Sequence, residues 1–105
     1  MRPARVAAAG LAAAFALPWG AQAQEPGARV FTEGAQPPCA LCHTLKAAGA
    51  QGTIGPSLDE LKPDKARVVE AVRRGVGVMP PFEGKLTAAQ IEAVAEYVAR
   101  AAGSG

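Results

Sequence analysis

The sequence has few of the side chains on which most metal and redox sites depend. Its 105 residues contain two cysteines, one histidine and, besides Met1, one methionine. Both cysteines and the histidine fall within one pentapeptide, CALCH, at residues 39–43. A structural zinc ion takes four ligands from Cys and His, and this chain supplies three at most. A conventional zinc site is therefore excluded.

The chain also lacks a hydrophobic run long enough to cross a membrane near its N-terminus. Residues 6–17 form an apolar run of twelve, whereas a spanning helix needs about 20 residues. Arg2 and Arg5 precede this run, and the small-x-small pattern of residues 21–23 follows it. This order is typical of a secretory signal peptide. We expect cleavage after Ala23, export to the periplasm and one mature domain at residues 24–105.

Residues 24–105 have no excess of side chains of either charge. The first 23 residues hold two of the eleven Lys and Arg and none of the nine Asp and Glu, which leaves nine of each sign. A balanced chain gives no support for binding to nucleic acid or to an anionic membrane surface. We expect neither a nucleic-acid partner nor stable membrane insertion.

Aromatic side chains are scarce as well, since Phe31, Phe82 and Tyr97 are the only ones in residues 24–105. A domain of this size usually needs a disulfide, a metal or a cofactor to hold its core together. A disulfide between Cys39 and Cys42 would close a very short loop and constrain little of the unfolded chain. A bound cofactor is the better candidate.

Three segments have the sequence pattern of helices, and no segment alternates as a strand does. The first, residues 28–33, stops at Gly34 and the prolines that follow. The second, residues 65–74, follows a suitable N-cap residue, Asp64, and ends at Gly75, where we expect left-handed backbone.

The third helix begins after Thr87, which has the capping-box spacing with Gln90. Leu86 and Ile91 are placed to pack across that start, and the helix runs through Ala102 to Gly103. Loops rich in glycine and proline join the three helices. We predict an all-α fold of about three helices whose long loops wrap around another group.

Three interpretations of CALCH remain. The first is a thioredoxin-type redox pair, but this requires a βαβ context, which is absent. The second and simplest is a local disulfide between the two cysteines. The third is covalent haem attachment, for which C-x-x-C-H is the recognised pattern. Cys39 and Cys42 would each add to one haem vinyl group, and His43 would then bind the iron. The export signal and the absence of any other Cys or His favour this interpretation.

The iron would need a second axial ligand or remain open. No second histidine exists, and Met79 lies in the loop GVGVMPPF. A single methionine is most often a core filler, but Pro80 and Pro81 stiffen this loop and favour an extended residue before them. We predict Met79 as the distal ligand. The alternative is a five-coordinate haem sensor or peroxidase-like protein.

His43 needs an acceptor for its other ring N–H, as ligating histidines generally do. The carbonyl of Pro56 is a candidate acceptor, and a simple turn is the alternative role for Pro56.

Five segments occur in the order found in class I monohaem cytochromes c of the small bacterial kind, which this chain resembles. They are GARVF (27–31), CALCH (39–43), IGPSLDEL (54–61), GVGVMPPF (75–82) and IEAVAEYVA (91–99). The resemblance implies a small cytochrome c fold around one haem c. It implies thioethers at Cys39 and Cys42, axial ligands His43 and Met79, and a hydrogen bond from His43 to Pro56.

The same resemblance implies that the first and last helices cross where Gly27 and Phe31 meet Tyr97. Many members of the family place a tryptophan near the haem propionates, and residues 24–105 contain none. Arg73 or Arg74 could take that place, although either could equally lie on a solvated helix face.

The expected function is electron transfer and not catalysis, because protein ligands in both axial positions leave no site for a substrate. A methionine opposite the histidine raises the haem potential, and an apolar shell of Ile54, Leu58 and Phe82 would act with it. Residues 31–64 further resemble the haem subunit of periplasmic sulfite dehydrogenases, which takes electrons from a molybdenum subunit. We expect such a dehydrogenase as donor and a further cytochrome or oxidase as acceptor.

Overall fold

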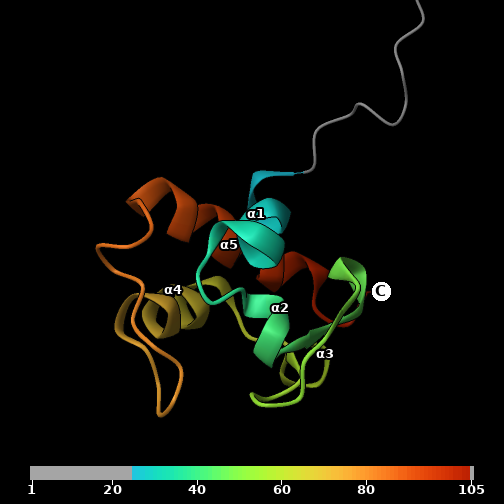
Figure 1. The fold of residues 1–105 in the computed structure, drawn as a ribbon. Coiled ribbons are helices and arrows are strands. Elements are labelled where there is room, and N and C mark those ends of the chain that lie inside the picture. Colours follow the sequence, from blue (N-terminus) through green and yellow to red (C-terminus); the bar gives the residue numbers. More distant parts are fainter. Residues whose placement is uncertain (1–24, 105) are drawn as a thin grey trace, which may run out of the picture.

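The computed structural model describes residues 25–104, and the expected signal peptide at residues 1–23 lies outside them. The described part is mainly helical (Figure 1). Its elements in chain order are α1 (Pro26–Arg29), the π-helix η2 (Val30–Gly34), α2 (Cys39–Cys42), β1 (Thr44–Leu45), the 3-10 helix η3 (Lys46–Ala48), β2 (Ala50–Gln51), α3 (Leu58–Leu61), α4 (Lys65–Arg74) and α5 (Ala88–Ala101).

The N-terminal helix is longer than predicted, since α1 and η2 together run from Pro26 to Gly34. It crosses α5 at close range (Figure 1). A Cβ atom on Gly27 would overlap the Ala93 carbonyl oxygen and lie 2.5 Å from Tyr97 Cβ. Phe31 meets Tyr97 edge to face, with ring centroids 6.3 Å apart. The crossing implied by the family resemblance is therefore present.

Helix α4 has the predicted bounds, and its start is capped as expected. The Arg67 backbone N–H donates to Asp64 Oδ1 at 2.8 Å. Its end differs in detail, because Gly75 has φ 74° and ψ 165°. The positive φ favours glycine, but the ψ value lies outside the left-handed helical region, because the chain turns there directly into the loop that carries Met79.

Helix α5 begins with the predicted capping box. The Gln90 N–H donates to Thr87 Oγ1 at 3.0 Å, and the Thr87 N–H donates to Gln90 Oε1 at 2.8 Å. The helix packs against both α1 and α4. Its buried face carries Val94, which with Phe31 and Leu45 is among the largest fully buried side chains of the described residues. No described helix has the length and apolarity that a membrane crossing requires.

The segment between α2 and α3 was expected to be loop alone and contains more regular structure. β1 and β2 pair antiparallel, with Thr44 opposite Gln51 and Leu45 opposite Ala50. Strands of two residues are too short to show alternation in the sequence. The same applies to α2 and α3, whose four residues make a single helical turn.

Candidate functional site

A cavity of about 390 Å³ lies among α2, α3, α4, α5 and the loop after α4, within the range of roughly 300–1,000 Å³ usual for ligand pockets. All seven residues predicted for the site border it. They are Cys39, Cys42, His43, Pro56, Leu58, Met79 and Phe82. The structure thus brings to one cavity residues that lie up to 43 positions apart (39 to 82) in the chain.

Cys39 and Cys42 form the ends of α2, one helical turn apart, and both are half-buried and unbridged. Residues three apart on a helix share a face, so both sulfurs can border the cavity. Burial raises the pKa of the Cys39 thiol to about 11, which keeps the sulfur uncharged at neutral pH. An uncharged sulfur in an apolar wall suits a thioether better than a thiolate bound to a metal ion.

The His43 ring is held by a backbone carbonyl. Its Nδ1–H donates to the Pro56 oxygen at 2.8 Å, which is the hydrogen bond that the resemblance implied. With the proton on Nδ1, Nε2 keeps its lone pair for a metal. His43 itself has extended backbone, φ −119° and ψ 142°, where the chain leaves α2.

Two glycines bring the Pro56 segment against α2, a feature that the sequence analysis missed. A Cβ atom on Gly52 would lie 2.5 Å from the Leu41 carbonyl oxygen, and one on Gly55 would lie 2.6 Å from His43 Cε1. The Gly55 N–H donates to the Cys42 carbonyl at 2.7 Å. The glycines of GTIGP were the available signal, because close approach of two segments requires residues without a Cβ.

Met79 reaches the cavity from a tight turn after α4. Val76 and Met79 exchange two backbone hydrogen bonds, of 3.1 and 2.9 Å. The turn is tied to α4 by the Phe82 N–H, which donates to the Val72 carbonyl at 2.8 Å. The Met79 side chain is half-buried and packs against the edge of the hydrophobic core, so it is held in a restrained loop and still borders the cavity.

The rest of the wall is mostly apolar. Helices α4 and α5 supply the buried residues Val68, Val72, Val94 and Val98. Their place in the wall could not be read from the sequence because it depends on how the two helices pack. Four exposed apolar side chains also border the cavity, and we call them the apolar rim: Ile54, Leu61, Val76 and Val78. Ile54, expected with Leu58 and Phe82 in an apolar shell around the haem, borders the cavity at its exposed edge, where it is 66% exposed.

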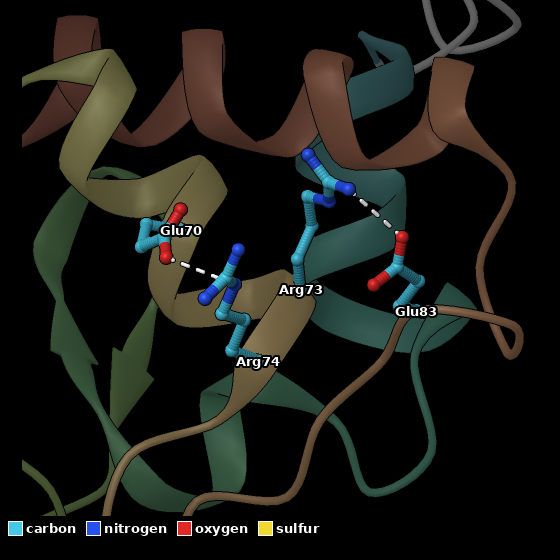
Figure 2. Close-up of polar contacts among 4 residues, drawn as sticks. All are labelled: Glu70, Arg73, Arg74 and Glu83. Carbon is cyan, nitrogen blue, oxygen red and sulfur yellow. Dashed lines mark hydrogen bonds and ion pairs between the residues drawn. The ribbon is translucent and has the colours of Figure 1, made fainter.

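Arg73 and Arg74 do not border the cavity. Arg73 pairs with Glu83 at 2.9 Å, and Arg74 pairs with Glu70 at 3.0 Å (Figure 2). Both arginines therefore lie on a solvated face of the helix and not at the cavity. The one Lys or Arg side chain among the described residues of the wall is Arg67.

These residues fit a haem attached through two sulfurs. The wall offers two unbridged cysteines, one oriented imidazole, one thioether and a surface that is otherwise mostly apolar. A small helical fold that brings a C-x-x-C-H motif and a methionine to such a cavity defines a c-type cytochrome.

The comparisons with known proteins agree with this class. Residues 22–98 match the family model described as "Cytochrome C oxidase, cbb3-type, subunit III". The chain belongs to this family of c-type cytochrome domains, and its cofactor is haem c. Two relatives of similar length are themselves cytochromes of the c type, c6 and c-551.

Among the solved structures, the c-type cytochrome SorU from Sinorhizobium meliloti is similar, with a TM-score of 0.72 and 55% identity over 74% of this chain and 88% of that one. Cytochrome c6 of Microcystis aeruginosa is 33% identical over 75% of this chain and 98% of its own length. Cytochrome c-551 of Halorhodospira halochloris is 29% identical over 69% and 92%.

A further relative is much longer than this chain. It is the cbb3-type cytochrome c oxidase subunit FixP of Bradyrhizobium sp. (strain ORS 278), 35% identical over 69% of this chain. The match covers 25% of FixP.

Proposed function

We propose that the mature protein, residues 24–105, is a periplasmic carrier of one electron on a covalent haem c with histidine and methionine as axial ligands. Cys39 and Cys42 form the thioethers, and His43 and Met79 bind the iron. The observation that supports this assignment is that all four side chains border one apolar cavity, in which the Pro56 carbonyl orients the His43 ring.

The haem supplies a one-electron couple. The protein's part is to fix its ligands and its surroundings. Pro56 holds His43 in the tautomer with a free Nε2, and the turn of residues 76–79 restrains the Met79 sulfur. Leu58 and Phe82 are buried and exclude water from the wall. An apolar wall and a methionine ligand both favour the reduced state and raise the potential.

As donor we propose a dehydrogenase, and more narrowly the molybdenum subunit of a sulfite dehydrogenase. The likeness of residues 31–64 to the haem subunits of those enzymes supports this choice. As acceptor we propose a further cytochrome or an oxidase in the respiratory chain. Similarity to FixP, whose name identifies an oxidase subunit, supports that choice.

Replacement of Met79 by alanine tests the ligand assignment. We expect the oxidised wild-type protein to show the weak absorption band at the red end of the spectrum that marks methionine bound to ferric haem. Met79→Ala should lose this band, and its reduction potential should fall. Val78→Ala is the matched control, because Val78 is 89% exposed in the same turn and should leave the band unchanged.

A Met79→Ala protein that keeps the band would disprove the assignment. A wild-type protein that lacks the band and binds carbon monoxide readily would favour the five-coordinate sensor or peroxidase-like alternative. Mass spectrometry of the same periplasmic sample separately tests whether the haem is covalently attached.

A further inference from the structure

We propose that Arg67 binds the haem's propionate groups, an assignment that rests on the proposed function. Propionates are carboxylates, and the cavity is otherwise poor in groups that could receive them. Among the described residues no Asp or Glu borders the cavity, and Arg67 is the one Lys or Arg that does. A cation at the edge of an apolar pocket is the expected partner for carboxylates that enter it.

The other basic residues of α4 are occupied elsewhere. Lys65 pairs with Glu92 at 2.9 Å. Arg73 pairs with Glu83 at 2.9 Å, and Arg74 pairs with Glu70 at 3.0 Å (Figure 2). Among the described residues Arg67 has no acidic partner. Of the four cations on this helix, therefore, the one that borders the cavity is also the one without a counter-ion.

The start of α4 fixes where this side chain originates. The Arg67 N–H donates to the capping Asp64 carboxylate at 2.8 Å, so the first turn of the helix is held in place. Val68 and Ala71, the next residue and the one a turn later, border the cavity as well. Arg67 itself is exposed, so its guanidinium can meet carboxylates at the solvent-facing edge and not in the core.

Arginine also suits this role chemically. Its planar guanidinium offers two parallel N–H groups to one carboxylate, whereas a lysine offers a point charge on a flexible stem. A positive charge at this edge would also raise the reduction potential, because it disfavours the more positive, oxidised state.

The direct test uses the wild-type protein. In the reduced, diamagnetic holoprotein, nuclear Overhauser effects should connect the Arg67 Cδ protons and Nε–H with the methylene protons of a propionate. Their absence, with Arg67 assigned and the propionates assigned, would overturn the proposal.

Three variants give a second test. Arg67→Gln should lower the reduction potential clearly more than Arg74→Gln, which removes the same charge from the solvent-facing side of the same helix. Arg67→Lys should keep most of the wild-type potential. Equal shifts in Arg67→Gln and Arg74→Gln would overturn the proposal.

The absorption band of methionine-bound ferric haem distinguishes a failure of the Arg67 assignment from a failure of the proposed function. A colourless wild-type protein, or one without the band, would contradict the proposed ligands and remove the basis for Arg67. A protein with the band but with equal shifts in the two glutamine variants would contradict the Arg67 assignment alone.

Discussion

At the level of single residues, the orientation of His43 depends on a position that has no side chain. Gly55 lies against the imidazole, and a Cβ atom there would be 2.6 Å from Cε1 and 3.0 Å from Nδ1. Such distances are shorter than van der Waals contact, so any larger residue would push the ring away from the Pro56 carbonyl. Gly55 is therefore a positioning residue for the histidine.

We predict that Gly55→Ala destabilises the haem-loaded protein by about 1–3 kcal/mol, the usual cost of overpacking a close contact. The urea midpoint of unfolding measures this loss, and the yield of protein with attached haem should fall with it. Gly34→Ala is the matched control, because a Cβ there would meet its nearest atom at 3.6 Å. Equal stabilities for the two variants would show that Gly55 does not constrain the ring.

Some residues that border the cavity could be predicted from the sequence and others could not, and the reason is physical. Cys39, Cys42, His43 and Met79, which the structure brings to one cavity, could be selected from the sequence. Few residue types bind haem or iron, and the chain has one C-x-x-C-H motif and one methionine besides Met1. Arg67 could not be selected in this way, because four cations share its helix and only the packing of α4 decides which of them borders the cavity.

At the level of elements, one carboxylate joins three segments that are distant in sequence. Asp59 of α3 accepts a hydrogen bond from the Lys46 N–H of η3 at 2.9 Å and one from the Gly103 N–H, beyond α5, at 2.7 Å. These bonds, chiefly that from Gly103, hold the pKa of Asp59 below its ordinary value. The ionised form is therefore favoured by the folded state.

This direction sets a pH dependence of stability. A carboxyl whose pKa is lower in the folded than in the unfolded state stabilises the fold above its unfolded pKa, here 3.8, and the stabilisation is lost as the pH falls through the folded pKa. Asp59→Asn should therefore lower stability at pH 7, because an amide cannot accept at both of its terminal atoms. The difference from wild type should shrink below pH 3.8.

Urea unfolding of the haem-loaded proteins near neutral pH and near pH 3 measures this difference. Glu60→Gln serves as the control, since Glu60 follows Asp59 in the chain and its carboxylate makes no hydrogen bond among the described residues. If the Asp59→Asn difference stayed constant across the two conditions, the carboxylate would not link these segments in the way described.

The elements that could be predicted well are those whose own residues contain the signals for a helix. α4 and α5 carry their own caps at Asp64 and Thr87 and are long enough to show helical periodicity. α2 and β1 do not, because a single turn or a pair of residues is held by its neighbours and not by its own pattern. The fold class could therefore be predicted, and the arrangement between α2 and α3 could not.

On the scale of the whole molecule, the surface around the cavity is apolar while the charges are balanced. Residues 24–105 carry nine basic and nine acidic side chains, and the apolar rim, Ile54, Leu61, Val76 and Val78, is exposed. Balanced charge gives little long-range steering of a partner, whereas exposed apolar side chains contribute once the surfaces touch. A redox partner should therefore recognise this face by short-range contact.

We accordingly predict a weak salt dependence of electron transfer with the proposed dehydrogenase. The second-order rate constant, measured by stopped flow, should change only a few-fold between roughly 20 and 200 mM salt, because screening acts on long-range charge interactions. Val78→Ser should slow the reaction at both salt concentrations, since Val78 belongs to the rim and is 89% exposed. Leu41→Ser is the control, as Leu41 is 58% exposed but does not border the cavity. A rate that fell by orders of magnitude with salt, or that Leu41→Ser lowered as much as Val78→Ser, would place recognition on charged groups or on another face.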